Sequence, residues 1–334
     1  MKILVIHPGS LGDVMLSLLA LHALRQAYPM AHMDVIGNPS IFELLKGRFY
    51  VDSVISIDRA DVSSCLTGHA DPAEPLACRL REYAFVVNWL GDRSGEFSHH
   101  LQYLGIKKIF SARPVSQRTN DQHRTQIFLD ALAPLGIPVP LTVPQLFPTQ
   151  VDKNLGREAL LEAGVSLSGQ PILTIHPGSG GLLKCWEFTR FMAVSRCVQE
   201  QLGFRPLFIF GPAERALSQR LKNSLGGDLP IVECLPLPVL AGALTWCSGY
   251  LGNDSGVTHL AAALGVPTVA IFGPTDPILW GPLGARVMIL SKRKEGKHVG
   301  EGVCHGCCCL DLISVEDVIQ SLASIALDYS SLIC

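Results

Sequence analysis

The pentapeptide Ile-His-Pro-Gly-Ser occurs twice in this chain, at residues 6–10 and at residues 175–179. Each copy follows a short apolar run and precedes a segment with helical periodicity. A strand, a tight Gly/Ser turn and a helix in this order direct free backbone N–H groups and the positive end of the helix toward an anion. Two such units half a chain apart predict an α/β protein with two Rossmann-like domains that face each other across a cleft.

Length and composition agree with two globular domains. The chain has 334 residues, 48% of them hydrophobic, and a mean hydropathy of +0.31. Its richest apolar run, residues 14–24, contains Ser17 and His22 and is shorter than the roughly 20 apolar residues that a bilayer span needs. We therefore expect a cytoplasmic protein. The formal net charge of −2 argues against a nucleic-acid partner, and eleven cysteines without a secretory signal predict mostly free, buried thiols.

Apolar runs of strand length alternate with helix-period segments, which predicts parallel sheets covered by helices. In the first half the expected strands are residues 2–6, 32–36, 53–57 and 84–88, and the expected helices are 12–27, 94–104 and 118–135. In the second half the expected strands are 171–175, 206–210, 231–232, 250–251 and 268–272, and the expected helices are 186–201, 213–225, 239–245, 256–264 and 315–327.

Five prolines between residues 134 and 148 predict an extended linker between the domains. We accordingly expect domains at 1–148 and 149–334, and leave open whether the last helix packs back on the first domain.

Asp13 follows the first pentapeptide in the segment Gly9-Ser10-Leu11-Gly12-Asp13. The glycines allow a tight turn and close approach by a ligand. Open α/β sheets place their ligand sites at the carboxyl ends of strands, where Asp13 would act as a general base. The alternative is an acid that complements the helix dipole at the first turn.

Lys184 ends the Gly/Ser-rich stretch that follows the second pentapeptide, and Trp186 comes two residues later. Backbone N–H groups, a hydroxyl and a mobile cation suit a diphosphate, although the stretch is neither a Walker A loop nor a dinucleotide GxGxxG motif. A flexible turn with a solvated lysine is the alternative.

Two later segments add polar groups after expected strands. Glu214, in Gly211-Pro-Ala-Glu214, lies where α/β proteins often hold ribose hydroxyls, or is simply an acid at a helix start. The segment 252–259 contains Asp254, Ser255, Gly256 and His259, which predict a second anion-binding helix N-terminus or, alternatively, a helix cap beside a core histidine.

These segments, in this order, resemble glycosyltransferase family 9, the heptosyltransferases of lipopolysaccharide core assembly. The resemblance covers the Gly-Asp helix entry, PGS…K-x-W, G-x-x-E, N-D-S-G-x-x-H-L-A-A-A-L-G-V-P and F-G-P-T-D-P. It implies a GT-B fold with an acceptor-binding N-terminal lobe and a nucleotide-sugar-binding C-terminal lobe. It also implies an ADP-sugar donor, ADP-L-glycero-D-manno-heptose, an inverting reaction, and neither metal ion nor cofactor.

The family's roles map onto matching positions. By resemblance, Asp13 is the catalytic base, Lys184 binds the phosphates and Glu214 holds the ADP ribose. Ser179 and Gly180 match positions that hold the diphosphate. The block beside the donor phosphates and sugar matches Asp254, Ser255, Gly256 and His259.

The acceptor side is less defined, because residues 88–92 depart from the family's usual D-L-Q-G pattern. Ser10 and Gly12 are candidates for acceptor contact. Basic residues that could meet acceptor phosphates, or form a solvated face, are Lys107, Lys108, Arg113, Arg118 and Arg124. The resemblance implies a lipid-linked or lipopolysaccharide core acceptor, which would bring the protein to the inner membrane, with the basic segment 292–297 as a possible contact.

Two further interpretations stay open. The cluster Cys304–Cys309 contains one CxxC pair without a second pair at zinc-finger spacing, which only weakly indicates a metal site. The alternatives to a lipopolysaccharide heptosyltransferase are a family member with another donor or acceptor, a GT-B nucleotide-sugar epimerase, and a nucleotide-sugar-binding protein without catalysis.

Overall fold

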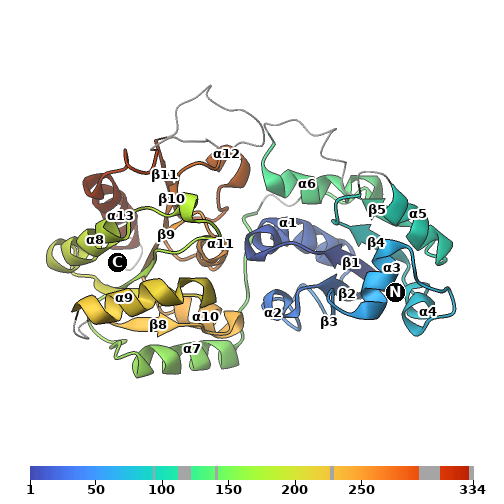
Figure 1. Ribbon diagram of the computed structural model, residues 1–334, viewed down its shortest axis with the longest axis horizontal. Helices are drawn as coiled ribbons and strands as arrows, with labels where there is room; N and C mark the ends of the chain where they lie inside the picture. The colour runs from blue at the N-terminus through green and yellow to red at the C-terminus, as the bar shows by residue number, and fades with distance from the viewer. Residues whose placement is uncertain (93–94, 112–121, 140–141, 226–228, 293–308, 331–334) are drawn as a thin grey trace. The chain divides into compact units, whose positions relative to one another are not determined.

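The computed structural model describes the chain except for residues 93–94, 112–121, 140–141, 226–228, 293–308 and 331–334. It divides into two compact units, Met1–Thr142 and Val143–Cys334 (Figure 1). The division falls at residue 142, inside the proline-rich segment whose end at residue 148 is the predicted boundary.

The first unit contains a parallel sheet with the strand order β3-β2-β1-β4-β5. Its strands are β1 (Lys2–His7), β2 (His32–Gly37), β3 (Ser53–Ser56), β4 (Phe85–Asn88) and β5 (Ile109–Ser111). In the register of this sheet, Ile3 of β1 lies opposite Met33 on one side and Phe85 on the other. All of β1 except Lys2 is buried, as expected of a central parallel strand with helices over both faces.

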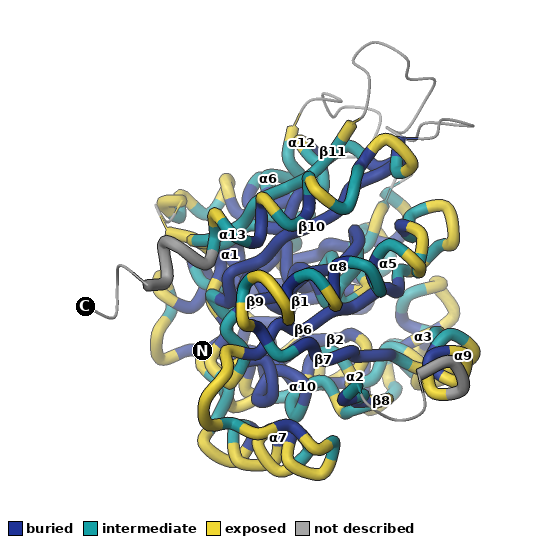
Figure 2. Tube along the Cα trace, turned by 90° about the vertical axis from the view of Figure 1, so that its left-hand side faces the viewer, coloured by how far each residue is buried: buried dark blue, intermediate teal, exposed yellow. Residues whose placement is uncertain are grey.

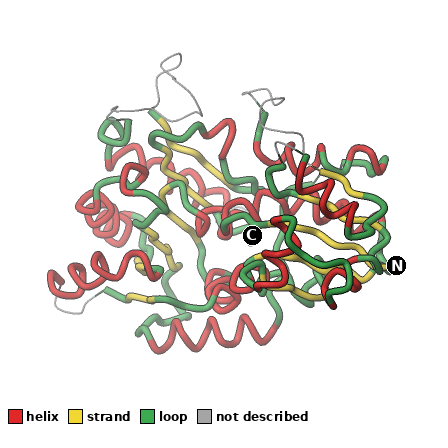
Figure 3. Tube along the Cα trace, turned by 45° about the vertical axis from the view of Figure 1, so that its right-hand side comes forward, coloured by secondary structure: helices red, strands yellow, loops and turns green. Residues whose placement is uncertain are grey.

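The helices of the first unit surround this sheet (Figure 3). They are α1 (Leu11–Ala27), α2 (Pro39–Phe42), α3 (Ala60–Thr67), α4 (Pro75–Leu80), α5 (Glu96–Tyr103), α6 (Arg124–Asp130) and the 3-10 helix η2 (Ala133–Leu135). Helix α1 is buried from Val14 to Leu21, and α6 packs against it. The burial of both its faces explains why the segment reads as continuously apolar.

The second unit has a parallel sheet in the order β8-β7-β6-β9-β10-β11. Its strands are β6 (Ile172–His176), β7 (Arg205–Phe210), β8 (Ile231–Glu233), β9 (Gly249–Asn253), β10 (Thr268–Phe272) and β11 (Val287–Ser291). Counted from β6, this is the 3-2-1-4-5-6 order of doubly wound dinucleotide-binding folds. The predicted fold class, with two parallel sheets, is confirmed.

The second unit also contains helices, several of which pack on its sheet. The helices are α7 (Gln150–Glu162), α8 (Phe188–Gln201), α9 (Arg215–Leu225), α10 (Leu237–Leu244), α11 (Gly256–Ala263), α12 (Pro277–Trp280) and α13 (Val315–Ser330), with the 3-10 helices η3 (Leu182–Lys184) and η4 (Pro212–Glu214). Helix α13 packs against α8, β10 and β11 of its own unit. Helix α7 packs against α10 and exposes its outer face to solvent (Figure 2).

Helix α7 is the largest element that the sequence pattern does not predict. Its contact with α10 is close enough that a Cβ on Gly156 would lie 2.1 Å from the backbone nitrogen of Ala243. A Cβ on Gly242 would lie 1.9 Å from the carbonyl oxygen of Asp152. Glycine at both positions therefore allows the two helix backbones to touch.

Candidate functional site

Both pentapeptides lie at a topological switch point, where the order in which the chain adds strands to its sheet reverses. In the first unit β1 runs between β2 and β4, and in the second β6 runs between β7 and β9. Chain connections leave such a pair of strands in opposite directions, which opens a crevice at their carboxyl ends where α/β proteins bind ligands. His7 is the last residue of β1 and His176 the last residue of β6, so each Pro-Gly-Ser turn enters its crevice.

In the second unit, Asn253 joins the loop after β9 to the loop after β6. Its Nδ2 donates to the carbonyl oxygen of Pro177 at 2.8 Å, and its Oδ1 accepts from the backbone N–H of Trp186 at 2.9 Å. The Ser179 hydroxyl donates to the carbonyl oxygen of Asp254 at 2.6 Å. These bonds fix the Gly/Ser turn against the start of α11 although the segments are about 70 residues apart in sequence.

Lys184 forms an ion pair across the same crevice. Its Nζ lies 2.8 Å from Oδ2 of Asp254, which also accepts a hydrogen bond from Oγ1 of Thr275 at 2.5 Å. Asp254 is buried, whereas about a third of the Lys184 side chain is exposed. The buried carboxylate therefore holds a cation whose outer side remains open to solvent.

Glu214 lies beside the second pentapeptide. Its Oε2 accepts the backbone N–H of Gly211 at 2.7 Å and is 3.9 Å from Nε2 of His176. Interaction with the His176 imidazole is the largest effect that holds the pKa of Glu214 below its usual value. A Cβ on Gly178 would lie 2.4 Å from Oε1 of Glu214, so glycine there makes room for the carboxylate.

The start of α11 connects to this group through Ser255. Its hydroxyl accepts the backbone N–H of Thr258 at 3.3 Å and lies 3.3 Å from Nδ1 of His176. Gly256 is the first residue of α11, and His259, one turn on, is buried. The structure therefore brings the second-unit candidates into one crevice: Ser179, Lys184, Glu214, Asp254, Ser255 and Gly256.

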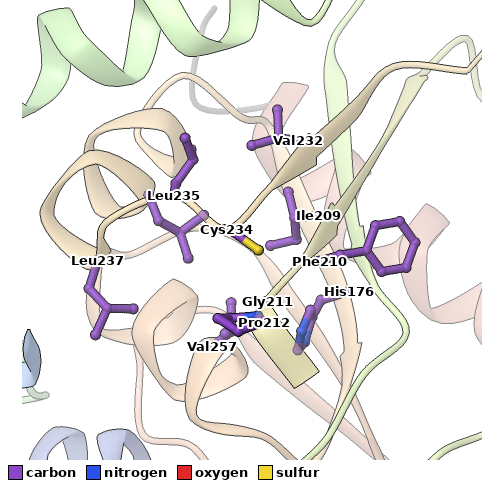
Figure 4. Close-up of a pocket in the computed structure, with 11 residues that line it drawn as sticks. His176, Ile209, Phe210, Gly211, Pro212, Val232, Cys234, Leu235, Leu237 and Val257 are labelled. Atoms are coloured by element: carbon purple, nitrogen blue, oxygen red, sulfur yellow. The ribbon is translucent and has the colours of Figure 1, made fainter. Parts of the chain in front are cut away.

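A cavity of about 140 Å³ opens next to this polar group (Figure 4). His176, Gly211 and Val257 line the cavity next to the polar residues, and the rest of its wall comes from β7, η4, β8, the loop after β8 and α10. The remaining lining residues are Ile209, Phe210, Pro212, Val232, Cys234, Leu235, Leu237 and Leu240. An apolar pocket beside a cation and free helix N–H groups suits a flat, largely apolar ring that carries a phosphate chain.

Cys234 corrects the expectation that the thiols are buried. Within the described part of the chain six cysteines are free, but only Cys65 of these is buried, and Cys78 and Cys234 are exposed. Cys309 is disulfide-bonded. The rest of the predicted Cys304–Cys309 cluster lies outside the described residues.

In the first unit, Asp13 lies at the third position of α1, with its side chain half-buried. The backbone N–H of Ser10 donates to Oδ2 of Asp13 at 2.9 Å, and the Ser10 hydroxyl donates to the same atom at 2.7 Å. Asp13 thus closes the first turn of α1, while among the described residues its Oδ1 receives no hydrogen bond. The helix-start and general-base interpretations are compatible on this geometry.

The acceptor-side candidates are only partly described. Gly12 is the second residue of α1, next to Asp13, and Arg124 is the first residue of α6. Lys107 and Lys108 are exposed before β5. Arg113 and Arg118 lie outside the described residues, as does most of the basic segment 292–297.

Three residues of the crevice were absent from the sequence-based candidates: His176, Asn253 and Thr275. Each lies inside or directly beside a motif that the sequence does indicate. For His176 and Asn253 the signal is polarity at the carboxyl end of an apolar strand, since His176 ends β6 and Asn253 ends β9. Thr275 lies in the loop after β10.

No group of three or more metal-ligating side chains gathers anywhere in the described ranges of the chain. None of the helices in those ranges is long and apolar enough to cross a membrane.

Comparison with known proteins agrees with this architecture. The family model for glycosyltransferase family 9 (heptosyltransferase) matches residues 106–305. Lipopolysaccharide heptosyltransferase 3 of Escherichia coli is 25% identical over 292 residues, covering 81% of this chain and 83% of that protein.

Solved structures share the fold over nearly the whole chain. A family 9 glycosyltransferase from Veillonella parvula has a TM-score of 0.77 at 21% identity and covers 98% of this chain and 97% of its own. The E. coli ADP-heptose lipopolysaccharide heptosyltransferase II has a TM-score of 0.75 at 22% identity, covering 99% and 100%. The fold is therefore GT-B, and the chain belongs to glycosyltransferase family 9, the heptosyltransferases.

Proposed function

We propose that this glycosyltransferase moves a heptose from ADP-L-glycero-D-manno-heptose to an inner-core lipopolysaccharide acceptor, with inversion at the anomeric carbon. The observation that carries the proposal is the second-unit crevice, in which an ion-paired lysine, a Gly/Ser turn and a helix start adjoin an apolar cavity. The names of the relatives, lipopolysaccharide heptosyltransferase 3 and ADP-heptose lipopolysaccharide heptosyltransferase II, support the choice of donor and acceptor.

In this proposal the donor occupies the second unit, with its adenine in the apolar cavity. Glu214 accepts hydrogen bonds from the ribose hydroxyls, since its carboxylate lies at the edge of that cavity beside Gly211. The diphosphate lies along the Gly/Ser turn at Ser179 and Gly180 and at the start of α11. Lys184 turns from Asp254 toward the phosphates, because its exposed side leaves room for that movement.

The acceptor occupies the first unit, where Asp13 acts as general base. As an acceptor hydroxyl oxygen attacks the anomeric carbon, its proton passes to Oδ1 of Asp13. The bond from the anomeric carbon to the ADP oxygen breaks in the same displacement, so the sugar inverts and ADP leaves with the bonding electron pair. Ser10, Gly12 and Arg124 are the described candidates for acceptor contact.

Lys184 and the N-terminus of α11 stabilise the negative charge that develops on ADP, as a metal ion does in other transferases. We therefore propose that the reaction needs no metal ion, and expect transfer to continue in EDTA. The acceptor is lipid-linked, which would bring the enzyme to the cytoplasmic face of the inner membrane.

Three alternatives can be distinguished by experiment. A family 9 enzyme with another sugar donor or another acceptor would keep the same crevice but transfer a different sugar or use a different acceptor. A nucleotide-sugar epimerase would consume donor without acceptor, and a non-catalytic binding protein would leave donor unchanged.

The first test is thermal shift with ADP, UDP and GDP on the wild type and on Lys184→Ala. Ligand at 100 times its Kd stabilises the native state by about 2.7 kcal/mol, a readily measured shift. We expect the shift to be selective for ADP and reduced in Lys184→Ala. A preference for UDP would contradict the donor assignment.

The second test is transfer from ADP-heptose by Asp13→Asn. The amide cannot accept the proton, so kcat should fall by about a thousandfold while the ADP-induced thermal shift stays unchanged. A variant with wild-type kcat would exclude Asp13 as the base.

A further inference from the structure

His7, the residue that ends β1, is enclosed by aromatic side chains from three other parts of the first unit. Its ring centroid lies 5.6 Å from that of Phe42 in α2, 5.3 Å from that of Trp89 after β4, and 5.3 Å from that of Phe128 in α6. The Phe128 ring stacks on it, and the other two meet it edge to face. His7 is only 1% exposed, so water does not reach the imidazole. We refer to Phe42, Trp89 and Phe128 as the aromatic box.

A polar contact links His7 to the turn that follows it. The backbone N–H of Gly9 donates to Nδ1 of His7 at 3.1 Å, which requires a lone pair on Nδ1. The neutral ring then carries its proton on Nε2, which has no hydrogen-bond partner among the described residues. Burial lowers the pKa of His7 to about 4, so the imidazole is neutral near pH 7 and Nδ1 stays an acceptor.

Gly9 and Ser10 connect His7 to Asp13. A Cβ on Gly9 would lie 2.6 Å from both Cβ of Asp13 and Cε1 of His7, so the turn packs closely between the imidazole and the acid. The next residue, Ser10, donates its backbone N–H and its hydroxyl to Oδ2 of Asp13. The position of the carboxylate therefore depends on the Pro8-Gly9-Ser10 turn, and the turn depends on Nδ1 of His7.

We infer that His7 is a positioning residue for Asp13: its neutral imidazole holds the Gly9 N–H and thereby orients Ser10 and the carboxylate. The inference rests on the proposed role of Asp13 as general base. A bond from a side-chain acceptor to the N–H two residues on is the Asx-turn geometry, which Asn and Asp usually supply. Because the aromatic box keeps the ring uncharged, His7 orders the turn without placing a positive charge beside the base.

Two substitutions separate the hydrogen bond from the packing. His7→Asn keeps an acceptor where Nδ1 lies, since Asn at this position forms an Asx turn with Gly9, but it removes the ring and buries an unpaired amide. His7→Phe keeps an aromatic ring in the box and removes the acceptor. We expect His7→Asn to have the lower Tm of the two and His7→Phe to have the lower kcat.

The expected kcat of His7→Phe is at least about tenfold below wild type, because a small displacement of a catalytic group costs a large factor in rate. His7→Asn should stay within about threefold of wild type when assayed below its own Tm. The KM for ADP-heptose should change in neither variant, because the proposed donor residues belong to the second unit. A purely structural role would instead make kcat follow Tm across the two variants.

Asp13→Asn separates this inference from the proposed function. If Asp13→Asn is inactive and His7→Phe has wild-type kcat, the positioning role alone is overturned. If Asp13→Asn keeps wild-type kcat, the proposed base is wrong and the positioning role falls with it. Should His7→Asn not fold, His7→Phe still decides: a lowered kcat at unchanged donor KM, with a Tm near wild type, supports the inference, and an unchanged kcat overturns it.

Discussion

The two copies of Ile-His-Pro-Gly-Ser end equivalent strands, β1 and β6, yet their histidines have opposite surroundings. His7 lies among aromatic rings, and its Nδ1 accepts a hydrogen bond from the turn that follows it. His176 lies between the Ser255 hydroxyl and the Glu214 carboxylate and lines the apolar cavity. One pentapeptide thus gives the same backbone turn in two chemically different crevices.

The asparagines that end the neighbouring strands β9 and β4 also have different partners. Asn253, which ends β9, ties its loop to the turn after β6. Asn88, which ends β4, instead bonds to the backbone N–H of Leu90 at 2.9 Å and to the hydroxyl of Ser111 on β5 at 3.3 Å. Polar bonds therefore join the two loops of the second crevice, whereas in the first unit the turn after β1 is bonded to His7 and to its own helix α1. This difference suits the proposed roles of the two units, with a preformed anion site in the second and an individually oriented Asp13 base in the first.

The largest expected effect concerns acid stability through His7. Its pKa is about 4 in the folded protein and 6.5 in the unfolded chain, so between these values only the unfolded chain binds the proton. Stability of the first unit should be full above pH 6.5 and fall by about 3 kcal/mol as the pH drops to 4. Urea denaturation at pH 7 and pH 5, followed by circular dichroism, measures this slope, and His7→Phe should remove most of it.

His99→Gln is the matched control for that slope, because it removes an exposed histidine of the same unit. It should behave as the wild type. An equal loss of stability between pH 7 and pH 5 in His7→Phe would show that the slope arises elsewhere.

The next effect compares the glycines of the two copies. At Gly9 a Cβ would meet Cβ of Asp13, an atom fixed to α1, at 2.6 Å, so Gly9→Ala must displace the turn or the acid. At Gly178 it would meet the mobile end of Glu214. We expect Gly9→Ala to lower kcat by about a hundredfold at unchanged donor KM. We expect Gly178→Ala to raise donor KM by about tenfold at nearly unchanged kcat, since one charge-assisted hydrogen bond is weakened.

Steady-state kinetics with varied ADP-heptose separates the two outcomes. Gly181→Ala is the control, since a Cβ there meets nothing within 4 Å. If both Gly9→Ala and Gly178→Ala changed only KM, the two copies would serve the same substrate, and the assignment of one to each substrate would be wrong.

Much of the fold is readable from the sequence because its signals are local. Buried parallel strands give apolar runs, and both pentapeptides mark the ends of such runs, so the sheets and most helices are predicted. Helix α7 is not predicted because the prolines up to residue 148 suggest an extended chain. Its start is nevertheless marked in the sequence, since Thr149 and Asp152 form a capping box. The half-buried strands β5 and β11, at the sheet edges, are not predicted: β5 has only three residues, whereas β11 contains an apolar run, 287–290, that does indicate a strand.

The site is less readable because its partners are distant in sequence. Lys184 and Asp254 are each indicated by a motif, but nothing local shows that they pair. The aromatic box likewise joins Phe42, Trp89 and Phe128 with His7, and no spacing rule connects these positions. Such contacts follow from strand order, which the sequence alone does not specify.

The smallest effect compares the two serines and tests the contrast between the joined and the separate crevice loops. Ser179 joins two loops through a hydrogen bond to Asp254, so Ser179→Ala should destabilise the second unit by about 1 kcal/mol. It should also weaken ADP binding several-fold in calorimetric titration, because the turn loses one of the hydrogen bonds that hold it against the start of α11. The hydroxyl of the exposed Ser10 donates to Asp13, which keeps the hydrogen bond from the Ser10 N–H after Ser10→Ala. Ser10→Ala should therefore cost about 0.5 kcal/mol or less and leave ADP affinity unchanged, with at most a modest fall in kcat. Equal effects of the two substitutions on ADP affinity would mean that the Ser179 bond does not preform the anion site, and that the two crevices differ less in rigidity than their hydrogen bonds indicate.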